Sequence, residues 1–240
     1  MERNAGMKTV RVCIITGYGI NADRELAQAF NMAGAAAQRV HVRDLIDNPG
    51  KLDEYHIAAF PGGFSFGDHL GSGKVFATLA KKHLKSMLDK MVAEGKLLMG
   101  VCNGFQVLVK MGILPNLEGG WNQEVSLIHN DSGKFEDRWV YLRKDPGCTS
   151  VWTAGTTGME VPVRHGEGKF ITRDEKIKKK LVDEELVAFV YGTKDDRLPV
   201  YPENPNGSEL DIAGITDRTG RIFGLMPHPE AFLVPQNHPR

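Results

Sequence analysis

The 240-residue chain carries 30 basic and 30 acidic side chains, so its formal net charge at pH 7 is zero. This balance argues against a broad phosphate-binding surface and predicts no nucleic-acid partner. The three cysteines are too few for a disulfide framework or a four-ligand zinc site, so we expect no metal. Residues 1–8 lack the apolar core of a signal peptide, and no apolar run reaches the ~18 residues that span a bilayer. We therefore expect a soluble, cytoplasmic globular protein with no membrane partner.

The first half of the chain alternates short apolar runs with helical patterns. These patterns predict strands over residues 10–16, 38–42, 56–60 and 96–101, and helices over residues 23–33, 75–93 and about 103–111. Asn21 is the expected N-cap of the first helix, and Gly34 follows its expected end. Strands that alternate with helices imply a parallel sheet with helices on both faces.

The second half of the chain is dominated by strand patterns. They predict one helix over residues 176–185 and strands over residues 125–128, 139–142, 161–163, 186–191, 212–215 and 222–225, the last two paired as a hairpin. No clean linker separates the two halves. We therefore expect an α/β fold in a single domain over residues 1–240, with an antiparallel extension of the sheet in the C-terminal half.

Gly100, Cys102 and Gly104 lie between a predicted strand and a predicted helix. This Gly-x-Cys-x-Gly pattern is typical of a nucleophile elbow, with sulfur in the place of the usual oxygen. The glycines are required because the turn is too sharp for a Cβ atom. The start of the following helix favours a thiolate at Cys102. The alternative is an inert buried cysteine in a tight turn.

Near the C-terminus, His228 and Glu230 lie two positions apart and are flanked by Pro227 and Pro229. A thiolate that forms a thioester needs a base, and the base needs a carboxylate to orient it. Side chains at positions i and i+2 of an extended segment point the same way, which predicts a His228–Glu230 pair. The alternative is a surface histidine in a proline-rich loop, which the presence of Cys102 disfavours.

Two glycine-rich turns follow predicted strands. Residues 61–68 leave a cluster of backbone N–H groups unpaired, which can stabilise an oxyanion together with the N–H of Asn103. Residues 17–22 fit the pattern Gly-x-Gly-x-x-Gly/Ala, and with Asp44 they outline an alternative dinucleotide site. That alternative leaves the cysteine, histidine and glutamate set unexplained.

Two motifs carry a resemblance to a known family. Gly-Val-Cys-Asn-Gly-Phe-Gln at residues 100–106 and Pro-His-Pro-Glu at residues 227–230 resemble the class I (triad) glutamine amidotransferases. Further stretches resemble, more narrowly, the glutaminase subunits of phosphoribosylformylglycinamidine synthases; they cover residues 19–25, 61–68, 130–139, 165–170 and 201–208. The resemblance extends over about residues 10–230. It implies a flavodoxin-like, class I glutaminase fold, with an open and mostly parallel sheet flanked by helices.

The resemblance also implies roles for individual residues. Cys102 would attack the side-chain amide of L-glutamine, His228 would transfer the proton, and Glu230 would orient His228. The remaining implied residues bind the oxyanion or the substrate glutamine; they are Gly63, Phe64, Asn103, Gln106, His165 and Gly166. Two alternatives stay open, because Gln106 can be a residue of the helix surface and His165 a loop histidine that shapes the backbone.

The family does not act alone. Its members pass ammonia to an ATP-binding synthetase subunit that converts formylglycinamide ribonucleotide, often with a small accessory subunit. We expect no cofactor in this chain, and ATP with magnesium on the synthetase partner. Residues 130–139, with Lys134, Glu136 and Arg138 expected to be exposed, are either a docking segment or a solvated loop.

Two further functions remain open at this stage. The chain can be a triad glutaminase that serves another synthetase, or a non-catalytic module that binds glutamine. Residues 231–240 fit the family pattern poorly, which leaves the details of partner docking open.

Overall fold

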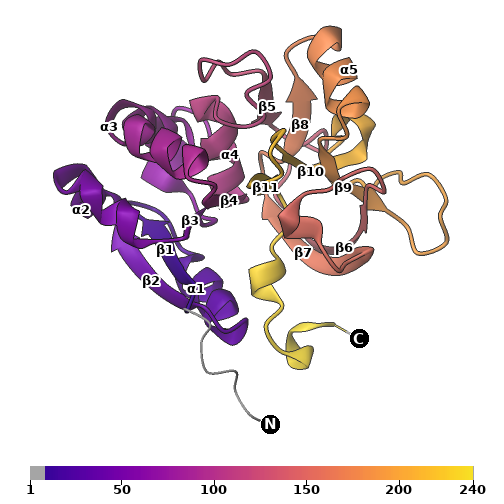
Figure 1. Ribbon diagram of the computed structural model, residues 1–240. Helices are drawn as coiled ribbons and strands as arrows, with labels where there is room; N and C mark the ends of the chain where they lie inside the picture. The colour runs from indigo at the N-terminus through magenta and orange to yellow at the C-terminus, as the bar shows by residue number, and fades with distance from the viewer. Residues whose placement is uncertain (1–8, 240) are drawn as a thin grey trace.

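A computed structural model describes residues 9–239 of the chain (Figure 1), so the expectation about residues 1–8 falls outside the described residues. The strands are β1 (Arg11–Thr16), β2 (Ala36–His41), β3 (Ile57–Phe60), β4 (Leu97–Val101), β5 (Val125–Ile128), β6 (Glu136–Lys144), β7 (Gly158–His165), β8 (Lys169–Thr172), β9 (Val187–Gly192), β10 (Ile212–Thr216) and β11 (Ile222–Leu225). The helices are α1 (Asp23–Met32), α2 (Val42–Asp47), α3 (Lys74–Ala93), α4 (Asn103–Met111) and α5 (Glu175–Asp183).

One large sheet runs through both halves of the chain. Its strand order is β2-β1-β3-β4-β11-β10-β9-β6-β7, while β5 and β8 form a separate antiparallel pair. Neighbouring strands from β2 to β11 are parallel, and all pairs from β11 to β7 are antiparallel. The expected parallel sheet with an antiparallel extension is therefore confirmed, including the β10–β11 hairpin.

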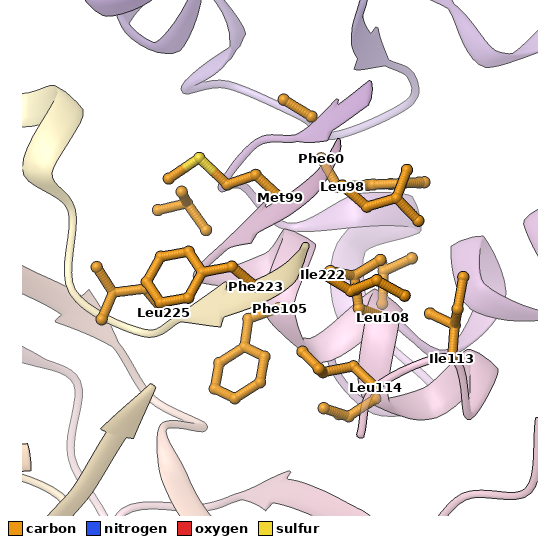
Figure 2. Packing of buried hydrophobic residues seen from close by; sticks show 14 of the residues in the cluster. Phe60, Leu98, Met99, Phe105, Leu108, Ile113, Leu114, Ile222, Phe223 and Leu225 are labelled. Carbon is orange, nitrogen blue, oxygen red and sulfur yellow. The ribbon is translucent and has the colours of Figure 1, made fainter. Parts of the chain in front are cut away.

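Helices cover both faces of the parallel strands, as expected. Figure 1 shows α1 on one face and the packed pair α3 and α4 on the other. Phe105 of α4 lies directly against β11, because a Cβ atom added at Gly224 would collide with the Phe105 ring. Figure 2 shows this buried layer, which also includes Leu108 and Ile222. Because α4 packs closely against the sheet, the start of the helix, where Cys102 lies, is held in a fixed position.

The structure departs from the expected elements in three places. Helix α2 begins where the second strand was expected to continue, since the His41 side chain accepts a hydrogen bond from the Arg43 N–H and caps the turn. Strand β8 was not expected at all. The N-cap of α1 is Ala22, without a side-chain hydrogen bond, so the assignment of Asn21 to that position was wrong.

Residues 130–139, the expected docking segment or solvated loop, also differ from the expectation. Glu136 is 3% exposed and accepts hydrogen bonds from Ser132 and Arg138 at the start of β6. Residues 136–139 are therefore part of the sheet, whereas residues 131–135 form an exposed turn before it. The expectation that Glu136 is exposed was wrong. Within residues 9–239, no helix is both long and apolar enough to cross a membrane.

Candidate active site

Cys102 lies at the carboxyl end of β4, in the turn before α4. Its backbone is strained, with φ 50° and ψ −109°, and its N–H donates to the Leu225 carbonyl oxygen at 2.8 Å. A Cβ atom added at Gly104 would collide with the Phe60 carbonyl oxygen, and one at Gly100 would lie 2.6 Å from the Gly104 carbonyl. The glycine requirement of the elbow is therefore confirmed, and it positions the sulfur at the sheet edge.

His228 and Glu230 form the buried pair that their spacing suggested. Glu230 Oε1 lies 2.6 Å from His228 Nδ1, and the two side chains are 7% and 1% exposed. The N–H of His228 donates to the Pro162 carbonyl oxygen at 2.8 Å, which fixes the segment against β7. The local reason given for the pair was wrong, because Pro229–Ala231 is a 3₁₀ turn and not an extended segment.

The side chains of Cys102 and His228 converge on Gly62. A Cβ atom added at Gly62 would lie 2.7 Å from His228 Cε1 and 3.4 Å from Cys102 Cβ, so only glycine leaves room for both. His228 Nε2 is buried and has no hydrogen-bond partner within residues 9–239. The imidazole is therefore held by Glu230 at one nitrogen and is free at the other for proton transfer.

The electrostatics of the site favour a charged pair. Burial alone would lower the pKa of His228, but the negative charges of Cys102 and Glu230 and the Glu230 hydrogen bond raise it to about 10. His228 is thus an imidazolium at neutral pH. An imidazolium beside a cysteine is able to act as an acid toward a leaving group.

The three expected oxyanion donors are not equivalent. Asn103 is the first residue of α4, and such N–H groups have no partner within the helix. Gly63 lies on the cavity wall with φ 150°, a conformation that favours glycine. The N–H of Phe64 instead donates to the Gly19 carbonyl oxygen at 2.8 Å, so it is engaged in this structure.

The glycine turn after β1 packs against the loop that contains Gly63 and Phe64. A Cβ atom added at Gly19 would collide with the Phe64 carbonyl oxygen, and Ile20 forms an isolated β-bridge with Gly63. Gly19 is therefore required for the close approach of two protein segments. This packing explains the glycine pattern at residues 17–22, which had outlined an alternative dinucleotide site.

Gln106 and Asn103 belong to a buried hydrogen-bonded network. Gln106 is 3% exposed, so its interpretation as a residue of the helix surface was wrong. Asn103 Nδ2 donates to Gln106 Oε1 at 2.9 Å and to Asp68 at 3.2 Å, and Gln106 Nε2 donates to the Glu167 carbonyl oxygen at 2.6 Å. Burial raises the pKa of Asp68. Sequence reasoning missed Asp68, although it ends the glycine-rich motif at residues 61–68.

His165 is buried at the end of β7 and shapes the adjoining loop. Its Nδ1 lies 3.2 Å from Asn130 Oδ1, and Asn130 also binds the backbone of His165, Gly166 and Gly168. Burial and the positive charge of His228 lower the pKa of His165 to about 4, so it is neutral. These contacts favour the interpretation of His165 as a residue that shapes the loop.

A cavity of about 310 Å³ opens above the nucleophile. Five of the residues proposed from sequence line it, namely Cys102, His228, Glu230, Gly63 and Phe64. The side chains of Asn103, Gln106 and His165 instead belong to the buried hydrogen-bonded network and the loop, and Gly166 lies in that loop. Sequence reasoning gave no role to two charged residues of the wall, Glu25 and Arg164, although Glu25 ends the resembling stretch at residues 19–25. No group of three or more potential metal ligands is found among residues 9–239.

We expect iodoacetamide to alkylate Cys102 much faster than Cys13 or Cys148. Cys102 lines the cavity, whereas Cys13 and Cys148 are 0% and 1% exposed. Burial also raises the pKa of Cys13 to about 12, so its thiolate is scarce. Peptide mass spectrometry after timed alkylation measures the three rates, and denatured protein is the control in which all three react. Equal rates in the folded protein would contradict the assignment.

Comparisons with known proteins agree with this geometry. Residues 9–240 match the CobB/CobQ-like glutamine amidotransferase domain. The chain is 44% identical to the phosphoribosylformylglycinamidine synthase subunit PurQ of Dehalococcoides mccartyi, over 98% of this chain and 90% of that protein. It is 42% identical to the subunit of the same name from Methanococcus maripaludis, over 95% and 85% of the two proteins. A chain in the structure of PurLQS from Thermotoga maritima aligns with a TM-score of 0.74 and 30% identity, covering 96% of this chain and 92% of that one.

Proposed function

The chain belongs to the CobB/CobQ-like glutamine amidotransferase family, and we propose that it is the glutaminase subunit of a phosphoribosylformylglycinamidine synthase. The observation that carries the proposal is the convergence of Cys102, His228 and Glu230 at one cavity. The high identity to the two PurQ subunits, over nearly their full length, supports the specific acceptor. The sheet that continues through both halves supports the expectation of a single glutaminase domain.

The geometry supports a thioester mechanism. The Cys102 thiolate attacks the side-chain amide carbon of L-glutamine, and the N–H groups of Gly63 and Asn103 stabilise the oxyanion. The His228 imidazolium donates its Nε2 proton to the amide nitrogen, so the C–N bond breaks and ammonia leaves. Neutral His228 then takes a proton from water, whose oxygen attacks the thioester and releases glutamate and the thiolate. Glu230 holds the imidazole in orientation throughout.

We further propose that the chain works with a synthetase partner. Ammonia passes to an ATP-binding synthetase subunit that converts formylglycinamide ribonucleotide to formylglycinamidine ribonucleotide, in the cytoplasm. The similarity to a chain of the Thermotoga PurLQS structure supports such an assembly, and a small accessory subunit completes it. ATP and magnesium belong to the synthetase, and this chain contributes no cofactor.

We expect the tagged chain to co-purify with an ATP-binding synthetase, and the complex to form formylglycinamidine ribonucleotide from glutamine, ATP and the formylglycinamide substrate. The measurement is identification of the partner by mass spectrometry, followed by chromatography of the nucleotide product. Co-purification with a synthetase of another pathway would favour a triad glutaminase with a different acceptor. Binding of glutamine without glutamate release in any complex would favour a non-catalytic module.

A further inference from the structure

The chain continues past the triad and folds back onto the strand pair β6 and β7. After the 3₁₀ turn Pro229–Ala231, residues 232–238 run below β7 in the view of Figure 1, where this segment is yellow. The Asn237 side chain accepts hydrogen bonds from the N–H groups of Leu233 and Val234 at 3.2 and 3.1 Å, which folds the segment into a compact turn. We call residues 232–238 the strap.

Three aromatic rings attach the strap to the sheet. The Phe232 ring lies 5.0 Å from the Trp139 ring of β6 in an edge-to-face arrangement, with an angle of 86° between the rings. The His238 ring lies 4.5 Å from the Trp139 ring and 5.5 Å from the Phe232 ring, so the three rings form one cluster. His238 Nε2 also lies 3.4 Å from Glu160 Oε2 of β7. Both ends of the strap are therefore held by the same two strands.

The same strand pair also holds His228. Trp139 lies opposite Pro162 in the register of β6 and β7, and the Pro162 carbonyl oxygen accepts the His228 N–H at 2.8 Å. Glu160 lies two residues before Pro162, so the two side chains are on the same face of β7. The groups that hold the strap and the group that holds His228 therefore lie within a few residues of each other on this strand pair.

The turn that contains Glu230 is not closely packed on its other side. A cavity of about 240 Å³ borders Pro229 and Glu230 on the side of α1, where Leu26 and Phe30 line it. Within residues 9–239, Glu230 Oε2 is buried without a hydrogen-bond partner, so the carboxylate is anchored through Oε1 to His228. The position of this turn therefore depends on the segments that precede and follow it.

We propose that the strap positions Glu230 and, through it, His228. The positioning residues are the three members of the ring cluster, and the proposal rests on the proposed glutaminase function. The Phe232 N–H donates to the Pro229 carbonyl oxygen at 3.1 Å and closes the turn, so the ring cluster begins at the last hydrogen bond of the turn. Release of the rings allows the turn to shift toward the cavity beside α1, and the imidazole then loses its alignment with the substrate amide.

Substitution of Trp139 tests the ring cluster. In the complex with the synthetase, we expect Trp139→Leu to lower kcat for glutamine hydrolysis about 10- to 100-fold and to keep KM within about threefold, because a misaligned base slows the reaction without weakening glutamine binding. Trp139→Phe keeps an aromatic ring for both partners and should restore most of the rate. Synthesis from free ammonium should be unchanged in both variants, because ammonia bypasses the triad.

Phe232→Ala gives a second test at a residue that is 37% exposed, so its loss should leave the fold intact. This variant should lower kcat for glutamine in the same way as Trp139→Leu. Val234→Ala is the matched control, because Val234 lies two residues further along the strap, is 45% exposed and carries no ring. Its kcat should match that of the wild type.

The hydrogen bond between His228 and Glu230 provides a readout that does not require activity. Its proton lies between two atoms 2.6 Å apart, and we expect it as a far-downfield resonance in the proton NMR spectrum of the full chain, assigned by its absence in His228→Asn. Trp139→Leu and Phe232→Ala should shift or broaden this resonance, and Val234→Ala should leave it unchanged. A variant that is merely less stable would keep the resonance of the wild type in its folded state.

The outcomes separate this proposal from the proposed function. A wild-type complex that does not release glutamate would overturn the glutaminase function, and the NMR comparison would still decide whether the strap positions Glu230. An unchanged resonance in both Trp139→Leu and Phe232→Ala, with or without a lower kcat, would overturn the positioning role. Loss of ammonium-dependent synthesis in these variants would show that the strap serves assembly with the synthetase, and this result would also overturn the proposal.

Discussion

Replacing Cys102 by alanine is expected to abolish glutamate release from glutamine, with a loss on the order of 10⁴-fold or more. The thiolate forms the covalent bond to the substrate, and neither His228 nor Glu230 can take its place from the positions they occupy. Product formation from free ammonium should persist, because ammonia bypasses this subunit and reacts on the synthetase. The measurement compares glutamine-dependent and ammonium-dependent synthesis in the same purified complex.

The matched control for this variant is Cys148→Ala. Cys148 is as buried as a core residue and lies away from the cavity, close to Thr153. The Cys148→Ala variant should retain glutamine-dependent activity. Its free energy of unfolding should fall slightly, because the variant buries one sulfur atom fewer. Glutamate release by Cys102→Ala at the wild-type rate would show that the reaction does not proceed through this thiol. Loss of the ammonium-dependent reaction would instead indicate that the variant fails to assemble.

Local patterns were sufficient to predict the parts of the site that depend on neighbours in sequence. The elbow was predicted from Gly100, Cys102 and Gly104, because the pattern lies within five residues. The collision at Gly100 is with Gly104 and is local, whereas the collision at Gly104 is with Phe60 of β3. The His228–Glu230 pair was also predicted, although its stated geometry was wrong. Two prolines with fixed φ angles are compatible with both an extended segment and a 3₁₀ turn, and packing against Pro162 selects the turn.

Contacts between distant segments could not be predicted from the same patterns. The hydrogen bond from the Phe64 N–H to the Gly19 carbonyl oxygen occupies a donor that the glycine-rich motif predicted to be unpaired. The cavity wall combines Glu25 with Arg164, and their meeting depends on the order of strands in the sheet. Helix α2 was missed for a related reason, since the β-branched Val42 favours a strand and the His41 cap overrides it.

We expect Glu230→Gln to lower glutaminase kcat by about 10²- to 10⁴-fold while largely preserving the fold. Glutamine can still accept a hydrogen bond from His228 Nδ1, so the change removes mainly the negative charge. Burial lowers the pKa of His228, and the charges of Cys102 and Glu230 together overcome this effect and raise the pKa to about 10. Without the carboxylate, the burial effect is opposed by Cys102 alone, and the pKa of His228 falls.

The sign of the pH effect follows from the direction of this shift. Departure of ammonia requires the imidazolium, which exists below the pKa of His228, so the alkaline limb of the kcat profile should move to lower pH in the variant. The protonated histidine also stabilises the folded state fully below its ordinary pKa of about 6.5, and that contribution is lost as the pH rises toward about 10. Thermal unfolding at several pH values should therefore show a smaller alkaline loss of stability in Glu230→Gln than in the wild type.

A surface carboxylate provides the control for this comparison. Glu175 on α5 is 86% exposed and does not line the cavity, and Glu175→Gln removes the same charge with the same change of shape. Both the kcat profile and the pH dependence of unfolding should match the wild type in this control. An unshifted alkaline limb in Glu230→Gln would mean that the carboxylate orients His228 without tuning its charge. A shifted limb with normal kcat at low pH would assign the carboxylate an electrostatic role alone, since proton transfer would then tolerate loss of the orienting charge.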